Sequence, residues 1–217
     1  MGVFVLIDAL IACALLAAWY VCLAQYNRKK AAHALHCVEA ACAGRGRILE
    51  ARWIGSCRVQ ARMGFAADWL ENARLTVRLL PRPIPIQWAL SLIRHQKETL
   101  TFEADLDYIP NFRLEVFRHR WLSQKHTHRN SGTTKWSISR PGPVVLTTRS
   151  QWTQELSPVV NTLMTSRGHN LIGVRFREES PQLSATVALD ALSGEEAAAS
   201  FLNVVHDLAT GASTSRQ

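Results

Sequence analysis

An apolar segment near the N-terminus constrains what this chain can fold into more than any other feature. The 22 residues from Val3 to Ala24 contain one ionisable side chain, Asp8. A helix of this length reaches roughly 33 Å, which is enough to cross the hydrocarbon core of a bilayer. Hydrocarbon offers backbone groups no partners, so a helix is the expected form. The sequence therefore predicts a transmembrane anchor over residues 1–27, with the span at Val3 to Ala24.

The residues around this segment predict its orientation. Trp19 and Tyr20 have amphipathic rings suited to the membrane interface, and a basic run, Arg28 to Lys30, follows them. Basic residues beside a span favour the cytoplasmic side. No basic residue precedes Val3, and the apolar stretch is longer than that of a secretory signal, so we expect the anchor to be retained. The prediction is a single-pass protein of the cell membrane, with its N-terminus outside and its C-terminal domain in the cytoplasm.

Asp8 needs its own explanation, because a carboxylate within a span is costly and often functional. It lies two helical turns from the N-terminus, close enough to the interface to remain hydrated or to be neutral. Alternatively, the segment Phe4 to Ala12 resembles the start of a type IV pilin or pseudopilin, which implies an acidic residue that pairs with a neighbouring subunit and an exported domain. The resemblance covers about nine residues. It departs from the family pattern at Val3, where the family has glycine, and in lacking a basic leader.

The positive charge of the chain is concentrated in its first two thirds. The net charge is +8, but residues 28–149 hold 21 basic and 9 acidic side chains, whereas residues 150–217 hold 4 and 7. A basic surface beside the anchor predicts attraction to an anionic leaflet, at about 1 kcal/mol per Lys or Arg near the headgroups. The same charge would attract nucleic acid, but the adjacent membrane is the simpler target, so no nucleic-acid partner is expected. The five cysteines form no paired framework and indicate reduced thiols, as in the cytosol.

A change from helical to alternating hydrophobicity predicts an antiparallel meander after the anchor. The juxtamembrane residues 28–46 are typical of a helix that ends at glycines. The next two alternating runs flank Gly55 and Ser56, which predicts a tight hairpin with Leu49 on its apolar face. Prolines then interrupt the sheet, and a short helix is predicted to begin at Pro85 and reach His95. The predicted strands of this part are residues 47–53, 57–65, 73–79, 99–106 and 112–121.

The remaining residues complete a prediction of the α+β class. Strands are expected at residues 144–149, 171–177 and 183–191, and helices at 151–166 and from a capping box at Ser193 to Gly211. The fold class is thus α+β, with a single N-terminal transmembrane helix followed by an antiparallel sheet (meander) and two or three helices packed on it. We expect an α+β soluble domain over residues 47–210, or two subdomains that divide near 122–142, and a disordered tail over 211–217.

The meander carries the pattern with the clearest functional content. Alternation places five arginines from neighbouring strands opposite the apolar face, which predicts a cationic sheet surface. A second basic group with an interleaved tryptophan, residues 113–129, has Glu115 as its one acidic residue. Such surfaces suit anionic headgroups or an acidic protein partner, although a solvated face needs no ligand. The candidate anion- or membrane-binding residues are Arg52, Arg58, Arg62, Arg74, Arg78, Arg118 and Arg120.

No residue pattern predicts catalysis, a cofactor or a metal ion. The chain has no nucleophile elbow, P-loop, H-E-x-x-H motif or dinucleotide glycine motif. His33, His36, Cys37 and Cys42 carry ligand atoms, but their spacing is not that of structural zinc sites. We therefore predict a membrane-anchored, non-catalytic protein whose basic domain binds an anionic lipid surface or an acidic protein. An enzyme without a local motif and a pilin-like structural subunit are the alternatives, and the oligomeric state is not predicted.

Overall fold

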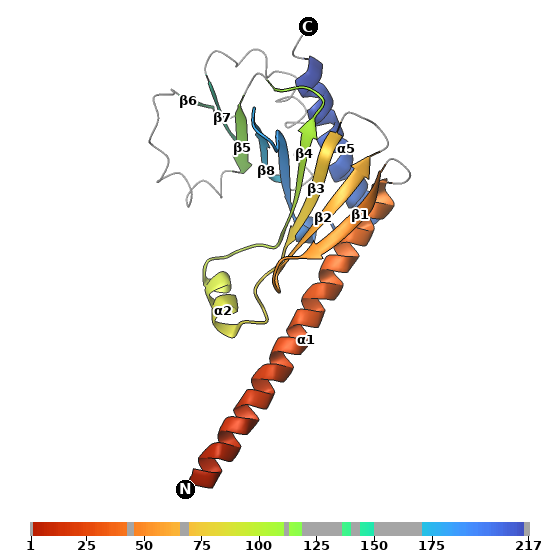
Figure 1. Cartoon of the computed structure of the whole chain (residues 1–217). Coiled ribbons are helices and arrows are strands. Elements are labelled where there is room, and N and C mark those ends of the chain that lie inside the picture. Colours follow the sequence, from red (N-terminus) through yellow and green to blue (C-terminus); the bar gives the residue numbers. More distant parts are fainter. Residues whose placement is uncertain are drawn as a thin grey trace.

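The computed structural model of the chain places an antiparallel sheet along one half of a long helix, whose other half projects freely to the N-terminus (Figure 1). It describes residues 2–42, 46–65, 70–110, 113–118, 136–139, 144–149 and 171–214. Strands form one sheet and two helices pack on it, so the predicted α+β class is confirmed.

The first element, α1 (Gly2–Cys42), is a single uninterrupted helix. The side chains of residues 3–22 are all exposed. Within the described part of the chain, α1 is the one helix long and apolar enough to cross a membrane by length and composition. Beyond the apolar segment, Asn27, Ala31 and Leu35 recur every four residues and are buried. The predicted anchor and the predicted juxtamembrane helix are therefore two halves of one rod that leads directly into the core.

Nine antiparallel strands form one sheet in the order β1-β2-β3-β4-β9-β8-β5-β7-β6. The first four are neighbours both in sequence and in space, as a meander requires. β4 then pairs with β9, so strands from both sides of residues 122–142 join one sheet. The strands are β1 (Gly46–Trp53), β2 (Arg58–Phe65), β3 (Leu70–Arg78), β4 (Thr99–Leu106), β5 (Leu114–Arg118), β6 (Trp136–Ser139), β7 (Val144–Arg149), β8 (Leu171–Phe176) and β9 (Leu183–Ala188).

A bulge in β1 reverses one prediction. The register against β2 shifts between Ile48 and Glu50. Because one extra residue exchanges the two faces of a strand, Ile48 lies opposite the buried Met63, while Leu49 is 53% exposed. The expectation that Leu49 faces the core is therefore wrong.

The predicted hairpin is confirmed, whereas the third strand begins earlier than predicted. The β1–β2 hairpin is present, and Gly55 supplies the left-handed backbone it needs, at φ 75°. Asn72, which precedes the predicted strand at 73–79, forms a bulge within β3, where it adopts φ 49° and its side-chain amide donates to Asp105 at 3.1 Å. Asparagine tolerates this conformation, so β3 continues back to Leu70.

The apolar face of the sheet packs against the second half of α1 and against α5 (Glu195–Thr214). Figure 1 shows α5 behind the sheet. Phe102 of β4 and Phe201 of α5 are fully buried, and the Phe65 and Phe102 rings meet edge to face at 6.1 Å. The core is thus continuous with the helix that carries the apolar span.

The C-terminal elements depart from prediction at three boundaries. β9 ends at Ala188, because Leu189–Ala191 forms a single 3₁₀ turn. The first main-chain bond of α5 runs from the Ala198 N–H to the Gly194 carbonyl at 3.1 Å, so Gly194 takes the cap position predicted for Ser193. α5 also continues through Gly211, because an internal glycine costs a helix only about 1 kcal/mol. The predicted helix end and the disordered tail from residue 211 are therefore wrong for residues 211–214.

Two predicted segments lie outside the described residues, namely the helix at 151–166 and most of the polar stretch at 122–142. The short helix predicted after the prolines is present as α2 (Pro85–Ile93). Its first residue is a proline. The missing N–H costs nothing there, because an N–H in the first turn of a helix has no main-chain partner within that helix. The β3–β4 connection carries α2 away from the core to the projecting half of α1 (Figure 1).

Candidate functional site

The face of the sheet opposite the core is polar. Directly opposed residues of antiparallel strands lie on the same face, and the alternate positions of β2 and β3 are buried on the other face. The strand register therefore gathers the five predicted meander arginines on one face, with Arg52 opposite Gln60, Arg58 opposite Arg78, and Arg62 opposite Arg74.

The arginines farther from the apolar span have acidic neighbours. Glu50 lies opposite Arg62 on one side, and Glu103 lies opposite Arg74 on the other. Residues Glu50, Arg62, Arg74 and Glu103 thus form a line across four strands, which we call the distal row. Its two positive and two negative charges balance.

The second line has no such balance. Arg58 and Arg78 oppose each other, and the next residues across the sheet are Thr99 and Ala188. Like charges directly opposed destabilise a sheet, by an amount on the order of 0.2–1 kcal/mol. This proximal row (Arg58, Arg78, Thr99 and Ala188) therefore holds an uncompensated pair of positive charges.

The proximal row lies at the end of the sheet nearest the apolar span. Asn27, three residues beyond Ala24, donates from its side-chain amide to the carbonyls of Ser56 and Leu80, at 3.4 and 3.1 Å. These two residues flank the proximal arginines in β2 and β3. Four residues of strand, or roughly 13 Å, separate Arg58 from Arg62, so the distal row is correspondingly farther from the apolar segment.

A groove of about 830 Å³ lies on the polar face, where α2 and the proximal arginines line one part of it and residues of β4, β5, β8 and β9 line the rest. We call it the polar groove. Arg58, Arg78, Arg94 and Arg175 line it, against two carboxylates, Glu103 and Glu115. This volume falls within the range of ligand-binding pockets.

Hydroxyl groups form much of the rest of the polar groove. Thr101 and Thr186 lie side by side across β4 and β9, with their Oγ1 atoms 3.1 Å apart. Thr76 is 7% exposed, and its Oγ1 has no hydrogen-bond partner among the described residues. A buried hydroxyl without a partner is unfavourable, so the groove offers a donor and acceptor to a polar ligand. Guanidinium and hydroxyl groups together suit the oxygens of a phosphate.

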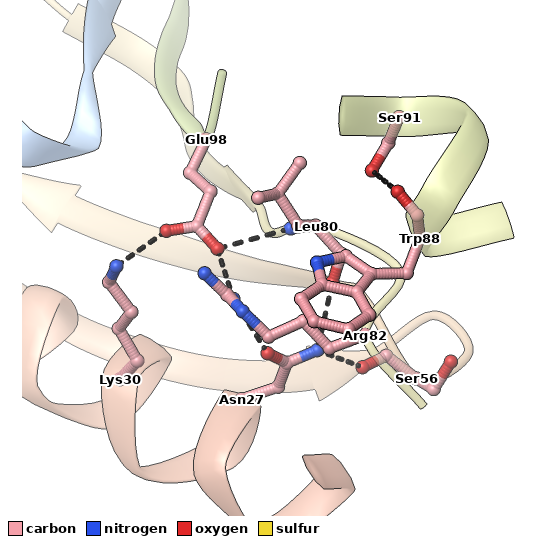
Figure 2. A network of polar contacts seen from close by, with 8 residues as sticks. All are labelled: Asn27, Lys30, Ser56, Leu80, Arg82, Trp88, Ser91 and Glu98. Carbon is pink, nitrogen blue, oxygen red and sulfur yellow. Dashed lines mark hydrogen bonds and ion pairs between the residues drawn. The ribbon is translucent and has the colours of Figure 1, made fainter. Parts of the chain in front are cut away.

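A half-buried ionic cluster holds the groove to α1 (Figure 2). Glu98, which precedes β4, forms ion pairs with Lys30 of α1 at 2.6 Å and with Arg82. The Arg82 guanidinium also donates to the side-chain carbonyl of Asn27 at 3.1 Å. We call Asn27, Lys30, Arg82 and Glu98 the Glu98 cluster. It joins both ends of the β3–β4 connection, and therefore α2, to the point where α1 leaves the apolar segment.

The surroundings of Glu98 set its protonation. Burial raises the pKa of this carboxyl, but hydrogen bonds from Lys30, Arg82 and the Leu80 N–H outweigh that effect and hold the pKa below its ordinary value. The folded protein thus binds a proton at Glu98 less readily than the unfolded chain does.

We expect acid to weaken the fold through this group. A carboxyl with a lowered folded pKa contributes stability above its unfolded pKa, near 4.5, and loses that contribution as the pH falls through the folded value. Unfolding temperatures of the full-length protein in detergent should therefore decrease as the pH falls below about 4.5 toward the folded pKa of Glu98. The Glu98→Gln variant should show a shallower decrease, whereas Glu50→Gln, at an exposed position, should follow the wild-type curve. A Glu98→Gln curve parallel to wild type would contradict this assignment.

Several predicted residues are not brought into this site. The backbone of Arg118 ends β5, and the structure does not describe its side chain; Arg120 lies outside the described residues. His33 and Cys37 face each other along α1, with Nε2 and Sγ 3.8 Å apart. The described residues contain no group of three or more metal-ligating side chains.

Sequence reasoning missed the residues that build the end of the site nearest the apolar segment. Arg94 reaches the polar groove from α2, and Asn27, Arg82 and Glu98 meet from segments up to 71 positions apart. The one local signal was Asn27, a polar residue on the helical face of Ala31 and Leu35. The spacing of Asn27, Ala31 and Leu35 along the helix does not reveal an ionic cluster, because the charged partners come from distant parts of the chain.

The chain has no match among models of known protein families, and none among curated proteins.

Proposed function

We propose that this protein is a membrane-anchored, non-catalytic binding module whose domain lies in the cytoplasm, and that its polar groove binds the anionic headgroup of a membrane lipid. The observation that carries the proposal is the unbalanced charge of the proximal row. Arg58 and Arg78 oppose each other without an acidic neighbour in the register, whereas the distal row is neutral.

The location of this charge favours a lipid over an acidic protein. The proximal row flanks the loops that contact Asn27, a few ångström beyond the apolar span. If the apolar span crosses a bilayer, the headgroups of the leaflet at its C-terminal end would lie next to these arginines. An acidic protein would be attracted equally by exposed arginines anywhere on the face, yet the distal arginines are offset by Glu50 and Glu103.

The basic run after the span supports a cytoplasmic domain, where anionic lipids are enriched. Arg28 and Lys29 are exposed on α1 and point away from the core. The pilin-like alternative draws on Asp8, which is exposed on the projecting half of α1 and would suit pairing with another subunit. A reporter fused to the C-terminus separates the two, because only the proposed orientation places it in the cytoplasm.

We expect the full-length protein to prefer an anionic lipid. Titrations in neutral detergent micelles, with bound lipid measured by native mass spectrometry, should give at least tenfold tighter binding of phosphatidylglycerol than of phosphatidylcholine. The preference should shrink in about 0.5 M salt, since charges near a surface are screened. Inorganic phosphate and soluble polyglutamate serve as competing ligands. Equal affinities for the two lipids would overturn the proposal, and displacement of phosphatidylglycerol by polyglutamate would favour the acidic protein.

A further inference from the structure

We infer that α2 is a second membrane contact, a short helix that lies in the interfacial layer of the bilayer beside the transmembrane half of α1. This inference goes beyond the headgroup proposal and does not require it, because it concerns the apolar side of α2 and the acyl boundary of the membrane.

α2 exposes an apolar surface that the rest of the described chain does not cover. Ile86 and Ile93 are 75% and 73% exposed, and Ala89 and Leu90 lie on the same helical face at spacings of three and four residues. Leu92 and Ile84 add exposed apolar area at the two ends. Among the nine residues of α2, only Gln87 and Ser91 are polar, and Ser91 is buried, with its hydroxyl donating to the Trp88 carbonyl at 2.7 Å.

Direct contacts set the depth of α2 against the apolar span. The Trp88 and Trp19 rings lie 5.9 Å apart, and the Trp19 indole N–H donates to the Arg82 carbonyl at 3.3 Å. Trp19 precedes the end of the span at Ala24 by five residues, or about 7.5 Å of helix. Interfacial helices bury their apolar face about 5–10 Å into the boundary of headgroups and acyl chains. The contact therefore places α2 at the depth expected for such a helix.

The two ends of α2 carry groups suited to the headgroup layer. Arg94, His95 and Lys97 follow its last turn and are exposed, so their long or polar side chains can extend toward water while the helix lies lower. Before the helix, Arg82 is held in the Glu98 cluster, and its guanidinium lies 5.1 Å from the centre of the Tyr26 ring. Both arms of the β3–β4 connection are thus fixed at the membrane boundary, which leaves α2 little freedom to lie elsewhere.

A lipid bilayer is the occupant that these observations favour over a second protein copy. Trp88 joins α2 to Trp19 of α1, and Ile86 and Ile93 lie on the opposite side of α2, where they face away from α1 at the depth of Trp19. A bilayer that surrounds residues 3–22 includes the depth of Trp19, so its interfacial layer would meet the exposed side chains of Ile86 and Ile93.

Site-directed spin labels test this inference in the full-length protein. Single cysteines, Ile86→Cys and Ile93→Cys, are introduced after the five native cysteines are replaced by alanine, and each label is compared with Leu15→Cys in the span and Leu49→Cys on exposed β1. The proteins are reconstituted in phosphatidylcholine, so that no anionic headgroup is needed. Circular dichroism and the unfolding temperature confirm that each labelled protein is folded.

Collision rates with oxygen, which concentrates in lipid, and with a water-soluble nickel chelate give the outcome. We expect the labels at positions 86 and 93 to resemble that at position 15, with high oxygen and low nickel collision rates, whereas position 49 shows the reverse. Labels at 86 and 93 that resemble position 49 would overturn the inference. Labels shielded from both reagents would also overturn it, in favour of a second protein copy. Lipid exposure at 86 and 93 without any phosphatidylglycerol preference would remove the headgroup proposal alone.

Discussion

Replacing Glu98 with alanine should lower the free energy of unfolding by about 3 kcal/mol, which corresponds to roughly 6–12 °C in the unfolding temperature of a chain of this size. The Glu98 side chain is 9% exposed and pairs with Lys30 and Arg82, while its Oε1 atom accepts a hydrogen bond from the Leu80 N–H. Its removal leaves the Arg82 side chain, which is 16% exposed, without its carboxylate partner. It also leaves the Leu80 N–H without its acceptor. The expected loss is near the lower end for a broken buried pair, because Lys30 is 36% exposed and can turn to water.

Thermal unfolding of the full-length protein, followed by circular dichroism in detergent, measures this effect. Glu98→Gln should fall between wild type and Glu98→Ala, because an amide oxygen can still accept from the Leu80 N–H but carries no charge. The matched control is Glu50→Ala, which removes a carboxylate from an exposed edge strand and should change the unfolding free energy by no more than about 0.5 kcal/mol. Equal losses at positions 50 and 98 would show that the Glu98 cluster contributes nothing specific.

Neutralising the proximal arginines together should weaken binding of phosphatidylglycerol by about thirtyfold. The Arg58→Gln and Arg78→Gln substitutions remove two positive charges at the membrane end, each worth about 1 kcal/mol against an anionic surface. The two losses sum to about 2 kcal/mol, which is near thirtyfold in affinity. They also remove a like-charge opposition, so the folded protein should be as stable as wild type or slightly more stable.

The distal arginines provide the matched control. Arg62→Gln with Arg74→Gln makes the same change in charge on the same two strands, at a distance of roughly 13 Å along the sheet. This distance exceeds the screening length of about 8 Å at physiological ionic strength, so binding should fall by less than about threefold. Equal losses in the two double variants would mean that total charge, and not the proximal row, governs binding.

Local pattern was enough to predict the elements that depend on neighbouring residues. The apolar helix at residues 3–24 follows from an unbroken apolar run, the start of α2 follows from Pro85, and the strands of the meander follow from alternating hydrophobicity. Alternation alone also placed Arg58, Arg62, Arg74 and Arg78 on one face, because successive side chains of a strand point to opposite sides.

The same reasoning failed where one residue changes the period or where distant segments meet. The bulge at Leu49 exchanged two side chains between faces, and alternation cannot reveal an inserted residue. The pairing of β4 with β9 joins residues more than 70 positions apart, and no local pattern specifies such a neighbour. For the same reason the acidic partners of Arg62 and Arg74, and the meeting of Lys30 with Glu98, were not predicted.

The apolar segment and the excess of basic residues were determined by the sequence itself, since length, hydropathy and charge are properties of the chain before it folds. Where that charge remains unbalanced was decided by the tertiary structure, because strand register neutralises the distal row and leaves the proximal row positive. The tertiary structure likewise carried α2 to Trp19, through contacts between residues 69 positions apart. These contacts turn a short apolar helix, unremarkable in sequence, into a candidate second contact with the membrane.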